Sequence, residues 1–357
     1  MAAIRLDKVT TAAGTPNIAL IKYWGKRNEK LILPYNSSFS MTLSKETLHT
    51  TTSVMFSEKL TEDVFYIDGI KQDLKNKDIF ERFEIINHLR VLAKTNVHVI
   101  VVSKNDFPTA SGLASSASGI STLVYCINEA LELKMSPREL SIIARQGSGS
   151  ACRSIYGGMV VWRRGEREDG KDSYSEQLFD EKYWPELIDN IVVLSQDKKK
   201  VSSRAGMKQT VETNPLYKAR PDSAEKRLDT IITAYKNKDF DVLADCIMTD
   251  SNEMHALMLS TKPSIRYLNS VSYEIMDVIE TLNRDQGKNV AAYTFDAGPN
   301  AQIITLKKYQ KLVDASLKPI KDSGKISYIK ISEVGSGPVI LKDEKYSLID
   351  SKKLSPR

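Results

Sequence analysis

The chain has 357 residues, of which 41% are hydrophobic and 27% charged, as expected of a soluble globular protein with room for two domains. The net charge of +6 comes from dispersed basic residues, which suits acidic substrates and argues against nucleic-acid binding. The three cysteines lie far apart and lack metal-ligand spacing, which favours reduced thiols in a reducing compartment. The sequence has no 18-residue apolar run and no signal-peptide pattern, so we expect a cytoplasmic protein that is not in a membrane.

The first part of the chain predicts strands followed by a helix. Residues 11–23 indicate a strand that is interrupted at Pro16 and Asn17 by a bulge or an edge position. Residues 47–56 and 63–67 are rich in β-branched side chains and predict a β-hairpin. Helical spacing predicts a helix over residues 77–94, whose apolar face is Ile79, Phe83, Ile86, Leu89 and Leu92.

A loop of small residues, Pro108 to Gly119, lies between an apolar strand at 97–102 and a helix at 120–133. This arrangement can bind phosphate, because small residues let the ligand approach the backbone, whose N–H groups and helix dipole attract an anion. A Ser- and Ala-rich turn before an ordinary helix explains the pattern equally well.

The second half of the chain contains further predicted elements and a boundary. Ser136 is expected to cap a helix that begins at Pro137. A change of composition at residues 196–200 divides the chain into an N-terminal ATP-binding domain, 1–195, and a C-terminal domain, 196–357. The remaining expected strands are 157–162, 191–195, 290–295, 302–305 and 326–331, and the remaining expected helices are 223–236, 240–258, 265–283 and 309–318.

Several polar clusters are candidates for an anion site. Arg153 follows Ser148 and Ser150, and Arg204 follows Ser203, so each guanidinium has hydroxyls beside it to complete a carboxylate or phosphate site. For each arginine taken alone, a structural salt bridge is as good an interpretation. Residues 22–27, Lys-Tyr-Trp-Gly-Lys-Arg, form either the wall of an anion site or a strand end with solvated lysines.

Asp296 follows an apolar strand and precedes Gly298 and Pro299. A carboxylate at such a strand end tends to point into a cleft. The alternative is an Asx turn or a helix cap.

Four segments together resemble the diphosphomevalonate decarboxylase family of the GHMP kinase superfamily. They are residues 17–27, the loop Pro108 to Gly119, Gly147 to Arg153, and residues 296–300. The resemblance extends from about Thr11 to Leu354. It implies an α+β, GHMP-kinase-like fold with a ribosomal-S5-like N-terminal lobe, a ferredoxin-like C-terminal lobe and a deep cleft between them.

The resemblance implies the ATP-dependent decarboxylation of (R)-5-diphosphomevalonate in the mevalonate pathway of isoprenoid and sterol biosynthesis. ATP phosphorylates the tertiary 3-hydroxyl, and phosphate then leaves together with CO2, giving isopentenyl diphosphate. Phosphorylation is needed because hydroxide is a poor leaving group. Mg2+ is expected to bridge the ATP phosphates and to keep several waters, and no all-protein metal site is visible.

The resemblance also implies roles for individual residues. Asp296 would deprotonate the 3-hydroxyl, Arg153 would hold the substrate carboxylate, and Lys22 would stabilise charge near Asp296. Expected substrate contacts are Asn17, Tyr23, Trp24, Gly25, Lys26, Ser148, Gly149, Ser150, Ala151, Cys152, Ser203 and Arg204. Expected ATP contacts are Ser103, Asn105, Pro108, Gly112, Leu113, Ala114, Ser115 and Ser116.

The resemblance leaves some points open. Relatives use an arginine near residues 75–78 on the substrate diphosphate, and here that stretch reads Lys-Asn-Lys-Asp. A phosphomevalonate or bisphosphomevalonate decarboxylase, or a mevalonate 3-kinase, is an alternative within the superfamily. An inactive ATP-binding sensor is an alternative of another class. Relatives are often homodimers, so a homodimer is expected.

Overall fold

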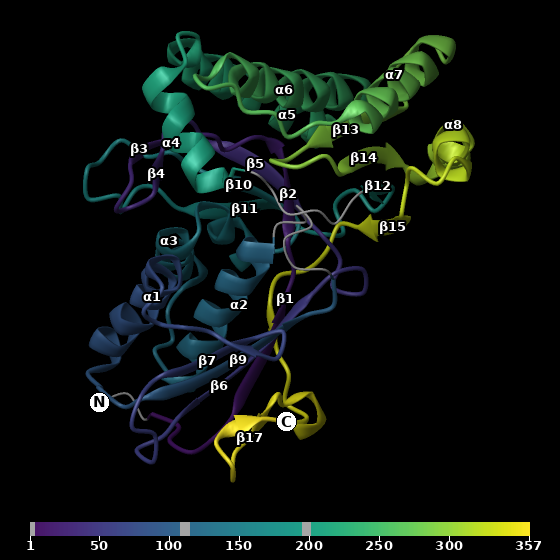
Figure 1. Cartoon of the computed structure of the whole chain (residues 1–357). Coiled ribbons are helices and arrows are strands. Elements are labelled where there is room, and N and C mark those ends of the chain that lie inside the picture. Colours follow the sequence, from purple (N-terminus) through teal and green to yellow (C-terminus); the bar gives the residue numbers. More distant parts are fainter. Residues whose placement is uncertain (1–3, 108–114, 195–200) are drawn as a thin grey trace.

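The structure, a computed structural model, describes residues 4–107, 115–194 and 201–357. Its elements form two lobes (Figure 1), with helices α1–α3 beside one sheet and α5–α8 beside another. The α-helices are α1 (Lys77–Ala93), α2 (Ser115–Ala130), α3 (Pro137–Gly147), α4 (Ser203–Thr213), α5 (Arg220–Asn237), α6 (Phe240–Ser260), α7 (Ser270–Asp285) and α8 (Gln310–Asp322). Among the described residues, no helix is both long and apolar enough to cross a membrane.

The first lobe is built on a six-stranded sheet in the order β16-β1-β6-β9-β7-β8. Its strands are β1 (Thr10–Gly14), β6 (Thr50–Phe56), β7 (Val64–Ile67), β8 (Ile70–Lys71), β9 (Val99–Asn105) and β16 (Val339–Ile340). The sheet buries apolar side chains such as Val54 and Val101 against Ile127 of α2. Burial of this apolar surface stabilises the lobe.

The predicted hairpin of residues 47–56 and 63–67 is wrong. Both segments are strands, but β9 lies between them and pairs parallel with β7. β-Branched side chains favour a strand without specifying its partner. The predicted helix at 77–94 is confirmed as α1, but its buried face differs from the expected one, because Ile85 is buried with Ile86 and Leu89 while Leu92 is 46% exposed.

A four-stranded sheet in the order β11-β10-β5-β2 adjoins the first lobe. Its strands are β2 (Asn17–Ile21), β5 (Ser38–Thr42), β10 (Met159–Trp162) and β11 (Ser175–Phe179), and a separate pair is β3 (Lys26–Asn28) and β4 (Leu33–Pro34). Pro16 therefore marks the point where the chain passes from β1 to a different sheet, and β2 is an edge strand of that sheet.

The second lobe contains a four-stranded antiparallel sheet in the order β13-β14-β12-β15. Its strands are β12 (Leu187–Val193), β13 (Ala291–Phe295), β14 (Ala301–Leu306) and β15 (Tyr328–Glu333). Helix α7 begins at Ser270, five residues later than expected, because Asn269 accepts a hydrogen bond from the Ser272 N–H and forms a capping box. The Ser136 cap of α3 is confirmed.

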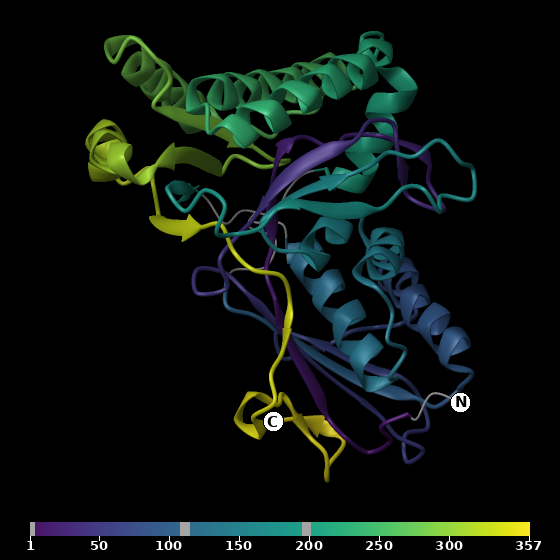
Figure 2. The ribbon, with the colours of Figure 1, turned by 180° about the vertical axis from the view of Figure 1, so that it is seen from behind.

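The chain crosses between the two lobes more than once. The stretch 195–200 lies outside the described residues, but β12 already belongs to the second-lobe sheet before it. After β15 the chain returns to the first lobe, where β16 pairs with β1 (Figure 2). The last pair, β17 (Ile349–Asp350) and β18 (Ser355–Pro356), packs Ile349 against Ile100 of the first sheet. The division into 1–195 and 196–357 stays a prediction.

Candidate active site

Most of the predicted site residues meet around one cavity of about 630 Å³. Those that line it are Asn17, Lys22, Tyr23, Trp24, Lys26, Ser103, Asn105, Ser116, Ser148, Gly149, Ser150, Arg153, Ser203, Arg204 and Asp296. They come from both lobes, because Lys22 follows β2 whereas Asp296 follows β13. A cavity of this size can hold a nucleotide or a small diphosphate.

Lys22 and Asp296 form an ion pair at one wall of the cavity. The Lys22 Nζ lies 2.8 Å from Asp296 Oδ1. The lysine side chain is 2% exposed and the aspartate side chain 32% exposed, so the carboxylate faces the cavity while the ammonium is buried behind it. An ammonium at this distance stabilises the negative charge of the carboxylate.

Arg153 lies on the 3-10 helix Gly149–Ile155 and is buried. Its Nε donates to Asn17 Oδ1 at 3.2 Å, and its Nη1 donates to Ser38 Oγ at 2.7 Å. The Asn17 amide also donates to the Ser150 carbonyl and the Ser154 hydroxyl. Burial lowers the pKa of Arg153 but leaves a guanidinium ionised at neutral pH. The guanidinium is thus a fixed cation with neutral partners, available to an anion in the cavity.

The residues after Lys22 are held by packing and hydrogen bonds. The Trp24 indole Nε1 donates to Thr210 of α4 at 3.0 Å, and the Tyr23 ring lies edge-on to Trp162 with centroids 4.7 Å apart. A Cβ at Gly149 would lie 2.6 Å from the Tyr23 ring, so only glycine allows this approach. The Lys26 ammonium pairs with Glu29.

The predicted ATP side is only partly described. Ser103 and Asn105 on β9 and Ser116 on α2 line the cavity. The Ser116 Oγ lies 3.3 Å from Ser148 Oγ, which joins the two clusters of small residues. Helix α2 begins at Ser115, five residues before the expected start at residue 120. The predicted contacts Pro108, Gly112, Leu113 and Ala114, and the Ser115 side chain, lie outside the described part of the chain.

The structure does not bring Gly25, Ala151 and Cys152 to the wall of this cavity. Gly25 has φ +106° and packs on Tyr217, whose hydroxyl would lie 1.8 Å from an added Cβ. Ala151 is part of the first-lobe core. Cys152 is buried, and burial raises the pKa of its thiol to about 11, which leaves the thiol protonated and unreactive at neutral pH.

Residues 14–175 match the sequence model of the diphosphomevalonate decarboxylase-like N-terminal domain, and residues 190–322 match that of the mevalonate 5-diphosphate decarboxylase C-terminal domain. The chain belongs to the diphosphomevalonate decarboxylase family. It is 44% identical to the diphosphomevalonate decarboxylase of Danio rerio over 85% of this chain and 77% of the relative. It is 40% identical to the enzyme of Schizosaccharomyces pombe over 96% and 95%.

A solved structure described as "MDDEF in complex with MVAPP, AMPPCP and Magnesium" superposes with a TM-score of 0.83 at 37% identity. The superposition covers 94% of this chain and 99% of that one. The two-lobed α+β architecture is therefore that of the decarboxylase family, with its GHMP-kinase-like fold.

Sequence reasoning missed several residues that line the cavity of this family member. Phe65, Ile67, Met207 and Met254 do so with apolar side chains. Their sequence pattern is that of ordinary core residues, so no signal in a single sequence separates them from the core. Ser38, which binds Arg153, was also missed.

Asp189, on β12, is a further missed residue near the family's candidate catalytic pair. It is fully buried, and burial raises its pKa to about 8, although the Lys22 ammonium opposes this shift. With the amide nitrogen of Gln302 turned toward it, that nitrogen donates to Asp189 Oδ2 at 2.6 Å. A carboxyl group in an otherwise mostly apolar strand was the available signal.

His255 gives a pH prediction for stability. Burial and the Lys22 ammonium lower the pKa of His255 to about 4. The unfolded chain takes up a proton near its ordinary pKa of about 6.5, so this residue's contribution to stability is lost as pH falls from about 6.5 to about 4. We expect about 2 kcal/mol of this loss between pH 7 and pH 5.

Urea unfolding of the wild type and of His255→Phe at pH 7 and pH 5 measures this contribution. The variant is expected to lack it, since phenylalanine cannot titrate. The change in the free energy of unfolding between the two pH values is compared between the proteins, because Asp189 contributes to it in both. Asp189 has the opposite effect to His255: its raised pKa lowers the free energy of unfolding as pH rises toward 8. Equal pH dependence in the two proteins would contradict the prediction.

Proposed function

We propose that the protein catalyses the ATP-dependent decarboxylation of (R)-5-diphosphomevalonate to isopentenyl diphosphate, ADP, phosphate and CO2. The observation that carries the proposal is the placement of the Lys22–Asp296 pair and the buried Arg153 around one cavity. Membership of the decarboxylase family supports it. The similar structure in complex with MVAPP and the ATP analogue AMPPCP supports the two substrates.

Asp296 acts in this proposal as the general base for the 3-hydroxyl. Its carboxylate reaches the cavity and can accept the hydroxyl proton as the oxygen attacks the γ-phosphorus. Lys22, at 2.8 Å, holds the carboxylate in place. The attack breaks the bond from the γ-phosphorus to the bridging oxygen, and ADP leaves with that electron pair.

Arg153 acts as the clamp for the substrate carboxylate. Its bonds to Asn17 and Ser38 set the plane of the guanidinium, so a bound carboxylate is aligned for cleavage. The C–CO2 bond then breaks, its electrons form the new double bond, and the 3-phosphate departs. Lys26, Ser203 and Arg204 provide hydroxyl and cationic groups for the diphosphate.

ATP is placed along β9 and the start of α2. Ser103, Asn105 and Ser116 line that side of the cavity, and the N-terminus of α2 favours a phosphate. No cluster of three or more His, Cys, Asp or Glu residues suitable for a metal occurs in the described ranges. The Ser116 hydroxyl, which lines this side of the cavity, would help to hold the phosphates of MgATP, and Mg2+ would neutralise phosphate charge.

The assay that tests the function follows ADP and CO2 separately with MgATP and 5-diphosphomevalonate, 5-phosphomevalonate or mevalonate. We expect equal amounts of ADP and CO2 with the diphosphate. Release of ADP alone would indicate a 3-kinase, and turnover only with the monophosphate would indicate a phosphomevalonate decarboxylase. ATP binding without turnover would indicate the inactive sensor.

The proposal extends to assembly and location. We propose a cytoplasmic homodimer, as the family resemblance implies. The end of α6 carries Leu259, which is 45% exposed and could meet a second copy. Light scattering at micromolar concentration tests the dimer, and a monomeric mass would contradict it.

A further inference from the structure

The main chain of Lys22 is held by side chains rather than by a strand. Strand β2 ends at Ile21, so the Lys22 peptide has no ladder partner there. Its N–H donates to Asp250 Oδ2 at 2.7 Å, and its carbonyl accepts from Arg220 Nη2 at 3.1 Å and from Asn36 Nδ2 at 3.0 Å. Both main-chain polar groups of this buried residue are therefore hydrogen-bonded, as buried main-chain groups require.

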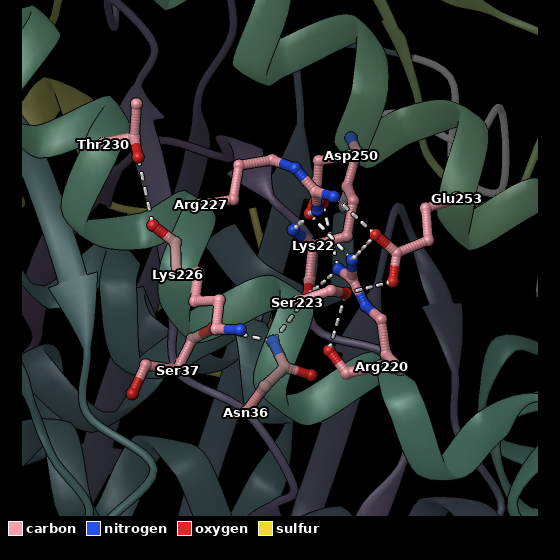
Figure 3. Close-up of polar contacts among 10 residues, drawn as sticks. All are labelled: Lys22, Asn36, Ser37, Arg220, Ser223, Lys226, Arg227, Thr230, Asp250 and Glu253. Carbon is pink, nitrogen blue, oxygen red and sulfur yellow. Dashed lines mark hydrogen bonds and ion pairs between the residues drawn. The ribbon is translucent and has the colours of Figure 1, made fainter.

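Asp250 belongs to a buried cluster of charges on α5 and α6 (Figure 3). Arg220 donates twice to Asp250, at 2.8 and 3.0 Å, and Arg227 bonds both Asp250 and Glu253 at 2.6 Å. The cluster pairs two cations with two carboxylates. Burial would raise the pKa of Asp250, but the attraction of Arg220 and the bond from the Lys22 N–H outweigh it and lower the pKa.

A buried ion cluster of this kind is weak evidence for stability. Desolvation of the charges costs free energy that the ion pairs only partly return, so apolar residues could fill the space as well. Its fixed geometry can instead serve to place the peptide that it holds. The main chain that it holds is the one at Lys22, which bonds to Asp250 and Arg220.

The next residue of α6 contacts the strand that carries Asp296, the other member of the proposed catalytic pair. The Ser251 hydroxyl accepts from the Phe295 N–H at 3.1 Å, immediately before Asp296. Consecutive helix residues point about 100° apart, so Asp250 reaches the end of β2 while Ser251 reaches the end of β13. Both are fully buried in the middle of α6.

We propose that Asp250 and Ser251 are positioning residues, which together set the distance between the Lys22 ammonium and the Asp296 carboxylate. One rigid helix spans the two strand ends that carry the pair, although these ends belong to different sheets. The pair is held from behind, on the side away from the cavity. This inference rests on the proposed function, since it assigns these residues to the same reaction.

The test compares variants at the two positions with matched controls. Ser251→Ala removes one hydroxyl, and we expect kcat to fall about tenfold, since small misplacement of catalytic groups costs up to about 100-fold. Ser251→Thr keeps the hydroxyl and should restore most of the rate. Ser260→Ala, on the same helix, should leave kcat within about twofold. The KM for ATP should stay within about twofold in every variant, because the ATP side lies on β9 and α2.

Asp250→Asn and Glu253→Gln each remove one negative charge from the cluster, but only Asp250 contacts the Lys22 peptide. We expect both to lower Tm, and only Asp250→Asn to lower kcat, by about 100-fold. A folded Ser251→Ala protein with the wild-type kcat would overturn the inference, as would equal loss of kcat in Asp250→Asn and Glu253→Gln. Wild-type turnover is measured first, so that failure of the proposed function is seen separately.

Discussion

Asp296→Asn is expected to lower kcat by about 10³- to 10⁴-fold, in line with loss of a general base. The amide has nearly the shape of the carboxylate but cannot take the proton of the 3-hydroxyl. It also carries no charge to pair with the Lys22 ammonium 2.8 Å away. Affinity for MgATP should change little, because the proposed nucleotide site lies on the other lobe. Initial rates of ADP release and titration with a fluorescent ATP analogue measure the two quantities.

Asp322→Asn provides a control for this prediction. Asp322 is an exposed carboxylate on α8 that pairs with Lys318 one turn away. Its replacement should leave kcat and ATP affinity unchanged. If Asp296→Asn kept a rate close to that of the wild type, Asp296 would be a turn residue, and the mechanism would need another base.

Arg153→Lys is expected to lower kcat/KM for the diphosphate substrate by about 100-fold, although the charge is kept. A single ammonium cannot hold Asn17, Ser38 and a substrate carboxylate in one plane, as the guanidinium can. The substrate should then bind more weakly and in a less favourable orientation. Steady-state rates of CO2 release, with the ratio of CO2 to ADP, measure the effect.

Arg163→Lys is the matched control, because Arg163 is a half-buried guanidinium that pairs with Glu176 outside the cavity. It should show wild-type rates. Near-normal kinetics of Arg153→Lys would remove Arg153 from the carboxylate site. A CO2 to ADP ratio below that of the wild type would place its role in the cleavage step.

Elements were predictable from the sequence where the residues that determine them lie next to one another in the chain. The Ser136 cap of α3 depends on atoms within a few residues, and the structure confirms it together with the Glu139 capping box. The pairing of β7 with β9 rather than β6 depends on contacts between distant parts of the chain. Composition does not report such contacts, so the hairpin prediction was wrong.

In the site, too, local signals identify residues, whereas contacts between distant parts of the chain do not show in the sequence. Lys22, Arg153 and Asp296 carry charge next to small residues and strand ends, and such residues stand out in a sequence. Their spacing depends on side chains from other parts of the chain: Asn17 and Ser38 contact Arg153, and α6 contacts the main chain at Lys22 and Phe295. Asp250 lies in a polar stretch of α6 between Thr249 and Ser251, which reads as solvent-exposed, and only the fold shows that it is buried and reaches Lys22.

The return of the chain to its first sheet bears on the order of events during synthesis. Strand β16, at residues 339–340, pairs with β1 at residues 12–13, so this sheet gains its edge only after the whole second-lobe sheet, β12 to β15, has been made. Ile349 covers Met55 and Ile100 later still. A nascent chain that ends before residue 339 would expose the β1 edge, which is a surface prone to pairing with other chains.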